Sequence, residues 1–242
     1  MAEQDEGTES KLRYMEACDR IREDILGGTF AFGSHLKIAD LAERYRTSHM
    51  PIREALRLLN GEGLVQIEPH RGVRVRRFDR AFVENLFDIR LVIEEMQCRR
   101  AAARRTPEHL EELHAARMAF EAIAEQGDTR GLLESNRRFH AAISAAAGNS
   151  EAETIELRHW RLLPTLWKAF GYPHTRVPVV VDDHRHIETA IRKGDADGAA
   201  ILAAAHCLKA KNDMLDSMER NRPEPPSAAK PAARRRVKSS TS

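Results

Sequence analysis

The sequence predicts a mostly α-helical protein in which an N-terminal winged helix-turn-helix precedes an antiparallel bundle of six to seven helices. Three observations support this fold class. Residues 36–76 show the pattern of two short helices followed by a hairpin. From Asp79 onward, apolar residues recur at helical spacing and no segment alternates convincingly as a strand. The length of 242 residues suits one small and one mid-sized domain.

Composition and charge divide the chain into four parts. We expect residues 1–10 to be disordered, residues 11–78 to form the winged helix-turn-helix, residues 79–219 to form the helical domain, and residues 220–242 to be a disordered basic tail. Residues 11–80 carry a net charge of +4 and residues 81–219 one of −4, whereas the tail carries +6. Positive charge therefore collects on the N-terminal domain and the tail, as in proteins that approach nucleic acid.

Apolar spacing and helix-end signals define the elements of the N-terminal domain. The positions expected to face its core are Leu36, Leu41, Ala42 and Tyr45 in the first short helix, and Ile52, Ala55, Leu56 and Leu59 in the second. Ser48 is placed to cap the second helix, and Gly61 and Gly63 end it. Val65 with Ile67, and Val73 with Val75, then alternate as two short strands.

The polar face of this domain is suited to double-stranded DNA. Arg53 and Arg57 are four residues apart on the second helix, and arginines follow on the wing with no acidic residue between Pro69 and Phe78. The guanidinium fork matches phosphate oxygens or a guanine edge. A solvated basic face is the alternative, but turn, cap, helix and wing all agree with DNA binding. The predicted contacts are Ser48, His49, Arg53, Arg57, His70, Arg71, Gly72 and Arg74.

Helix-start and helix-end residues divide the remaining chain into six helices. The first is expected over residues 80–105, and Thr106 caps the second. Asp128 opens the third, which runs to Gly148. The fourth covers residues 151–169, a loop covers residues 171–178, and the last two helices cover residues 182–193 and 195–219. Six helices in this length form an antiparallel bundle with room for a pocket in its core.

Three histidines of this bundle are expected to face its core. His140 shares a helix face with Asn136, His184 precedes Ile187 at helical spacing, and His206 lies four residues after an apolar leucine. Buried imidazoles need partners, and one divalent ion would satisfy all three, since imidazole suits zinc, nickel and other first-row metals. The alternative is that each histidine is separately satisfied within the core.

The N-terminal motifs resemble those of GntR-type regulators. The family's P-x-R-E-A-L-x-x-L is present at residues 51–59, E-G-L-V at 62–65, and the basic R-G-x-x-V wing at 71–75. The expected helix over residues 18–28 is similar to the family's first helix. Two positions depart from the pattern, since His49 stands where arginine is usual and Ala39 where a basic residue is usual. The operator sequence therefore cannot be inferred from relatives.

Residues 81–215 resemble the FCD effector domain of the FadR subfamily. The resemblance rests on Arg90 with Glu94, on N-R-R-F-H at 136–140, on Gly148 with Asn149, and on the spacing of His184 and His206. It implies that a divalent ion, with zinc favoured and nickel or manganese as alternatives, is held by Asn136, His140, His184 and His206. Aspartate is commoner than asparagine at the first position. The resemblance also implies a homodimer that binds a palindromic operator.

Asn136 has a consequence for the ligand. Four neutral donors leave the ion's two positive charges uncompensated, which favours an anion in the open positions. We therefore expect a small carboxylate metabolite as effector, with Arg90 as a second anchor. The alternative for Arg90 is a surface ion pair with Glu94.

Two other functions are open to such a site: a metal-dependent hydrolase, or a purely structural metal in a regulator without an organic effector. The sequence contains no HExxH motif and no carboxylate pair near the histidines, so it gives the enzyme no support. We expect a repressor rather than an enzyme. Three widely spaced cysteines and the lack of a long apolar run indicate a cytoplasmic protein without a membrane anchor.

Overall fold

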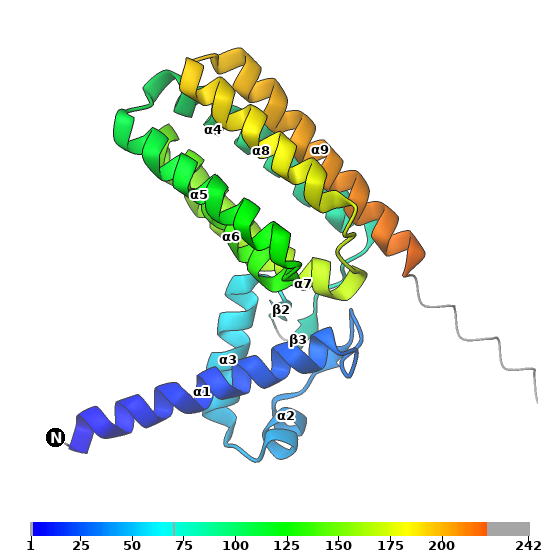
Figure 1. Cartoon of the computed structure of the whole chain (residues 1–242). Helices are drawn as coiled ribbons and strands as arrows, with labels where there is room; N and C mark the ends of the chain where they lie inside the picture. Colours follow the sequence, from blue (N-terminus) through cyan, green and yellow to red (C-terminus); the bar gives the residue numbers. More distant parts are fainter. Residues whose placement is uncertain (1, 70, 222–242) are drawn as a thin grey trace, which may run out of the picture.

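The computed structural model describes residues 2–69 and 71–221, and within this part it contains a winged helix-turn-helix followed by a bundle of six helices (Figure 1). The mostly α-helical fold class is thereby confirmed. The elements are α1 (Ala2–Leu26), β1 (His35–Leu36), α2 (Ile38–Tyr45), α3 (His49–Glu62), β2 (Val65–Glu68), β3 (Gly72–Val75), α4 (Arg80–Arg104), α5 (Pro107–Gln126), α6 (Thr129–Ala147), α7 (Ser150–Phe170), α8 (Arg176–Lys193) and α9 (Ala196–Arg220).

The wing is a small antiparallel sheet with the strand order β1–β3–β2. Its central strand, β3, pairs on both sides, since Arg74 lies opposite His35 in β1 and Gln66 in β2. The expected two-stranded hairpin thus gains a third strand. Leu36, expected in the first helix, belongs to β1. It is buried either way, and two residues are too few for their apolar spacing to distinguish strand from helix.

The recognition helix α3 follows the sequence prediction at both ends. Ser48 occupies the N-cap with extended backbone, although its side chain makes no capping hydrogen bond among the described residues. Gly63 ends the helix in the left-handed region at φ +82°, which glycine adopts without steric cost. The four apolar residues predicted to face the core from this helix are all buried.

The chain departs from the prediction at its N-terminal end. α1 begins at Ala2, so residues 2–10 are helical rather than disordered. At the other end α9 continues to Arg220, and residues 222–242 of the predicted disordered tail lie outside the described residues.

The helical domain is built around α4 and α9, which lie side by side along its length (Figure 1). α8 packs against α9, and α5 packs against both α6 and α8. One boundary differs from the prediction: α8 starts at Arg176 rather than near residue 182, so the loop after α7 is shorter. Pro178 lies in the first turn of α8, where its missing N–H costs nothing. None of the described helices is long and apolar enough to cross a membrane.

A continuous apolar core joins the two domains. One buried cluster contains Leu59 and Leu64 from the winged domain together with Phe87 and Leu162 from the bundle. A second cluster lies between α4, α6, α8 and α9 and includes Phe139. The cysteines Cys18, Cys98 and Cys207 are all free and buried. The winged domain therefore packs against α7 through buried apolar side chains and is not connected to the bundle by a linker alone.

Candidate metal centre and nucleic-acid interface

The polar face of α3 is open to solvent. His49, Arg53 and Arg57 are exposed, and Ser48 is exposed at the start of the helix. Arg57 donates to Glu54 Oε1 at 2.7 Å, an exposed pair that phosphate could replace. The predicted recognition surface thus exists as one accessible face.

The arginines of the wing separate into two groups. Arg71 and Arg77 are exposed, as is Gly72, whereas His70 lies outside the described residues. Arg74 turns inward, because its Nη1 donates to the Gly33 carbonyl oxygen at 2.6 Å and its Nη2 lies 2.5 Å from His35 Nε2.

Arg76, which follows β3, also turns inward. Its Nε donates to the Gly63 carbonyl oxygen at 2.6 Å, and its guanidinium lies 5.4 Å from the centre of the Phe82 ring. These bonds show that Arg74 and Arg76 hold the wing in place. A DNA contact by Arg74 remains a prediction.

In the helical domain, three helices bring the predicted histidines together. α6 carries His140, α8 carries His184 and α9 carries His206, and one ring nitrogen from each lies within 4.8 Å of the others. All three are buried, and His184 is 0% exposed. The rings of His184 and His206 have centroids 5.2 Å apart. The three imidazoles therefore form one cluster.

The cluster has unsatisfied hydrogen-bonding atoms. Both ring nitrogens of His184, Nε2 of His140 and Oδ1 of Asn136 are buried without a hydrogen-bond partner among the described residues. Buried polar atoms are normally paired, because an unpaired one loses its water without compensation. Lone pairs that converge from three helices are the donor set that a divalent first-row ion takes. The residues present therefore fit a metal ion.

Carboxylates lie beside two of the imidazoles. Asp183 Oδ2 lies 3.1 Å from His206 Nδ1, which leaves Nε2 as the free donor, and Lys209 Nζ donates to the other oxygen of Asp183 at 2.6 Å. Glu94 Oε2 lies 3.8 Å from His140 Nδ1. A carboxylate behind an imidazole is a common support for metal-binding histidine, since it fixes the tautomer and raises basicity.

Burial favours the neutral form of His140 and His184. It lowers the pKa of both imidazoles well below the ordinary value of 6.5. A neutral imidazole offers a lone pair to a metal, whereas a protonated one does not.

Arg90 lies beside this cluster in the core, which corrects the surface ion-pair alternative. Its side chain is 4% exposed and donates to Glu94, which is 3% exposed. The guanidinium lies 4.2 Å from the centre of the Trp160 ring, and its Nε and Nη1 have no partner among the described residues. Two buried N–H donors are thus left over for an anion.

A small cavity of about 30 Å³ connects these groups. Arg90, Asn136, His140 and His206 line it, and so does Arg176, which is buried and paired with Asp213. Arg176 was not predicted as a site residue because residues 171–178 were expected to form a loop. A helix start near residue 176 places its side chain about two turns before His184.

Two single carboxylates lie near the histidines, where the sequence predicted no carboxylate pair. Glu94 approaches His140, and Asp183 approaches His206. Both are already matched by a cation, Glu94 by Arg90 and Asp183 by Lys209. Their positions suit support of the imidazoles.

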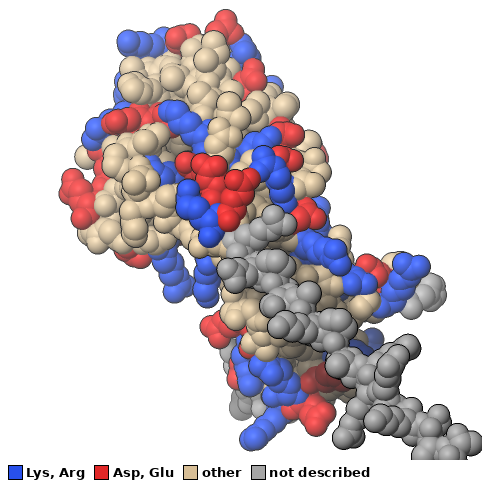
Figure 2. Space-filling view, turned by 90° about the vertical axis from the view of Figure 1, so that its right-hand side faces the viewer, with Lys and Arg blue, Asp and Glu red and all other residues tan. Residues whose placement is uncertain are grey.

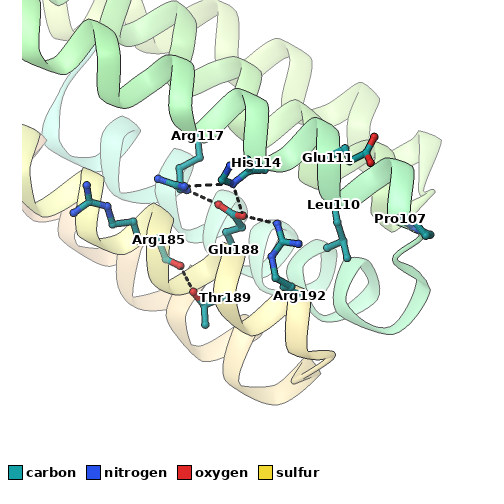
Figure 3. Close-up of a pocket in the computed structure, with 9 residues that line it drawn as sticks. All are labelled: Pro107, Leu110, Glu111, His114, Arg117, Arg185, Glu188, Thr189 and Arg192. Atoms are coloured by element: carbon teal, nitrogen blue, oxygen red, sulfur yellow. Dashed lines mark hydrogen bonds and ion pairs between the residues drawn. The ribbon is translucent and has the colours of Figure 1, made fainter.

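The helix that carries His184 is braced from outside by a charged cluster. A groove of about 880 Å³ runs between α5 and α8, and in it the buried carboxylate of Glu188 accepts from Arg117, His114 and Arg192 (Figure 3). Glu188 is one turn after His184 on α8. The cluster holds α8 against α5 and so positions His184.

On the face of the helical domain that Figure 2 draws, basic and acidic side chains are interspersed. The exposed arginines that are predicted to contact DNA lie instead on α3 and the wing, as Arg53, Arg57 and Arg71.

Comparison with known proteins matches both halves of the chain. Residues 85–209 match the family described as the FCD domain, and residues 13–75 match the bacterial regulatory proteins of the gntR family. The probable D-xylose utilization operon transcriptional repressor of Paenarthrobacter nicotinovorans is 27% identical, over 83% of this chain and 90% of that protein. The transcriptional repressor RspR of Escherichia coli K12 is 28% identical, over 83% and 88%. The galactonate operon transcriptional repressor of the same organism is 24% identical, over 72% and 85%.

Solved structures share the fold. Lar of Listeria monocytogenes superposes with a TM-score of 0.67 at 16% identity, over 86% of this chain and 96% of that one. E. coli McbR/YncC does so with a TM-score of 0.63 at 20% identity, over 84% and 97%. Sequence identity at this level shows a shared fold and does not identify the ligand.

Proposed function

The chain belongs to the GntR family of bacterial transcriptional regulators and carries an FCD domain, and from this premise we propose that it is a repressor whose DNA binding responds to a carboxylate metabolite bound at a metal centre. Its family consists of regulators, which leaves the hydrolase alternative without support. The observation that carries the metal and effector is the cluster of His140, His184 and His206, in which His140 and His184 have unpartnered nitrogens. The unpartnered Oδ1 of Asn136 belongs to the wall of the same cavity.

The charges around the cavity support an anionic effector. Glu94 is matched by Arg90, Asp183 by Lys209, and Asp213 by Arg176, so the surroundings are close to neutral. The donor set is neutral as well. A divalent ion bound there supplies two uncompensated positive charges and attracts a carboxylate, and Arg90 offers its two spare N–H groups as the second anchor.

The name of one relative agrees with a small hydroxy-acid. One is called a galactonate operon repressor, and galactonate is a sugar acid that carries one carboxylate and several hydroxyls. We therefore take a sugar acid or a related hydroxycarboxylate as the first effector class to test. Repression that is relieved by ligand is the expected direction.

A homodimer would place two copies of α3 on the halves of a palindrome. An exposed apolar stripe on the α4–α9 pair is suited to this contact. Ile89 and Val92 on α4 are 53% and 63% exposed, and Ile201 on α9 is 68% exposed. Two ion pairs between α4 and α9, formed by Asp88 with Lys211 and by Arg99 with Asp197, flank the stripe with charges of both signs.

α7 is suited to couple the two domains. Trp160, Leu163 and Trp167 on α7 line the cavity. Leu162, between them in sequence, lies against Gly63 at the end of α3. A shift of α7 on ligand binding would therefore reach the recognition helix through one contact.

Metal content is the first experiment. The purified full chain and the variants His140→Ala, His184→Ala and His186→Ala are compared by elemental mass spectrometry. His186 is an exposed histidine two residues from His184, so its variant serves as the matched control. We expect stoichiometric metal in the wild type and in the control, and loss in the other two. Full metal retention by His184→Ala would overturn the site.

Ligand response is the second experiment. Galactonate and other hydroxycarboxylates are titrated against the melting temperature and against binding to a duplex selected from a random pool. A ligand that raises the melting temperature, weakens DNA binding and is recovered unchanged supports the sensor. A metal that is retained while no carboxylate has any effect would support the purely structural alternative.

A further inference from the structure

We propose that Tyr172 is a gate between the histidine cavity and a cleft that separates the bundle from α1, so that metal and effector enter from the side of the DNA-binding domain. The proposal rests on the proposed function, since it concerns access to the same site. It follows from three observations: the size of the cavity, the place of Tyr172 in its wall, and the charge of the cleft.

The cavity is closed to a ligand as the structure stands. Its volume of about 30 Å³ is enough for water, since about 10–15 Å³ holds one molecule, and is too small for a sugar acid. Part of the wall therefore has to move before an effector can bind. All residues that line the cavity belong to helices, with the single exception of Tyr172.

Tyr172 lies in the five-residue segment 171–175 between α7 and α8. Gly171 before it has φ +86°, a conformation that favours glycine, and its amide donates to the Trp167 carbonyl oxygen at 2.8 Å. The far end of the segment is held, because the Arg176 amide donates to the Pro173 carbonyl oxygen at 3.0 Å. The Tyr172 ring rests edge-on against Trp167, with centroids 5.0 Å apart. It is thus the wall residue with the least backbone restraint.

A larger cleft lies directly beyond this wall. It has a volume of about 790 Å³, and Leu133, Trp167 and Tyr172 line both it and the cavity. Its opposite side is formed by α1 of the winged domain, through Arg22 and Leu26 among others. When Tyr172 swings aside, the cavity opens into this cleft and not into bulk solvent on the far side of the bundle.

The cleft carries a net positive charge. The charged residues that line it are the basic Arg22, Arg130, Arg161 and Lys168 and the acidic Asp19 and Glu23. Such a cleft attracts anions and repels cations, and its effect on entry rates depends on ionic strength. A carboxylate effector would therefore be drawn toward the gate, and its arrival would place it against α1.

The chain contains its own probe for the test. Its two tryptophans, Trp160 and Trp167, both line the cavity. Ni²⁺ quenches indole fluorescence, so rapid mixing of the metal-free full chain with Ni²⁺ gives the association rate, and displacement with excess chelator gives the dissociation rate.

Tyr172→Ala is expected to raise both rates by about tenfold or more while the dissociation constant changes by less than about threefold, because a gate alters kinetics and leaves the bound state alone. Tyr172→Phe keeps the ring and removes only the hydroxyl, which interacts with Arg176, so its rates are expected to stay nearer those of the wild type than those of Tyr172→Ala. Unchanged rates in Tyr172→Ala would overturn the gate.

Charge reversal tests the direction of entry. Lys168→Glu is expected to accelerate Ni²⁺ association by about twofold or more at low salt, because it removes repulsion of the cation from the cleft. Arg138→Glu, an exposed substitution on α6 outside the cleft, is the matched control and is expected to have no effect. An equal response of the two variants would overturn entry through the cleft.

The two proposals can fail separately. If the wild type takes up no Ni²⁺, the metal centre fails, and the gate is then read from acrylamide quenching of the metal-free protein. A larger quenching constant in Tyr172→Ala than in the wild type and in Tyr172→Phe supports the gate. Equal quenching constants in all three overturn it.

Discussion

Alanine at position 63 tests the contact between the recognition helix and the bundle. Gly63 ends α3 at φ +82°, and a Cβ there would lie 3.2 Å from Leu162 Cδ1 and 3.4 Å from Cδ2. The left-handed conformation costs an alanine about 1–2 kcal/mol. Crowding of the buried Leu162 adds about 1 kcal/mol, as small insertions into a packed core do. We expect Gly63→Ala to lower the free energy of unfolding by about 2–3 kcal/mol.

Gly61 offers a matched control on the same helix. It lies inside α3, and a Cβ added there would meet nothing within 4 Å. Gly61→Ala should therefore stabilise the protein by about 0.5–1 kcal/mol, because alanine is the better helix former. Urea denaturation followed by far-UV circular dichroism measures both variants against the wild type. Equal unfolding free energies in the two variants would refute this account of the α3–α7 contact.

Asparagine at position 63 separates the two costs. Asparagine tolerates the left-handed region better than alanine and yet brings a Cβ to the same place. Gly63→Asn is expected to be less destabilising than Gly63→Ala while it keeps the crowding of Leu162. If operator affinity falls in both variants in step with the crowding, α7 communicates with α3 through this contact.

Three further predictions concern the site and the interface. His184→Phe should abolish metal binding and stabilise the metal-free protein by about 1–2 kcal/mol in urea with chelator present, because an apolar ring replaces two unpaired buried nitrogens; a destabilised variant would contradict this. Burial, with the nearby charge of Glu94, raises the pKa of Glu156 from 4.5 to about 8. The protonated carboxyl therefore contributes stability below pH 4.5 that is lost as the pH rises through about 8. Glu156→Gln should flatten this loss in urea titrations from pH 5 to 9, and an unchanged slope of stability against pH would count against the prediction. Arg53→Ala should weaken binding to a selected duplex by about tenfold or more in fluorescence anisotropy, with a shallower salt dependence if Arg53 contacts phosphate, whereas an unchanged dissociation constant would remove Arg53 from the interface.

Local signals were sufficient for most of the fold. α3 was predictable because its N-cap serine, its apolar spacing and its terminal glycine all act within the helix. The start of α8 was not, because Pro178 was taken for a loop residue although proline is equally at home in a first helical turn. β1 was missed because a two-residue strand is defined by its partner β3 and not by its own pattern.

The candidate site was likewise predictable only in part. Helical spacing placed His140, His184 and His206 on inward faces, and the structure brings them together. The carboxylates of Glu94 and Asp183 were not anticipated because their approach depends on how α4, α8 and α9 are packed, which no spacing within one helix encodes. Arg90 was predicted as a site residue, but its burial depends on the same packing and was not predicted.

The three buried cysteines make the chain suitable for mapping its own local unfolding. Burial raises the pKa of the Cys18 thiol to about 11 and raises that of Cys98 and Cys207 above the ordinary value, so at neutral pH each is protonated and shielded from thiol reagents. Labelling then requires the surrounding helices to open first. Cys18 reports on α1 in the winged domain, Cys98 on α4, and Cys207 on the segment of α9 that lines the cavity. Peptide-resolved alkylation would thus give the opening free energy of each domain separately, in the wild-type sequence and without an added label.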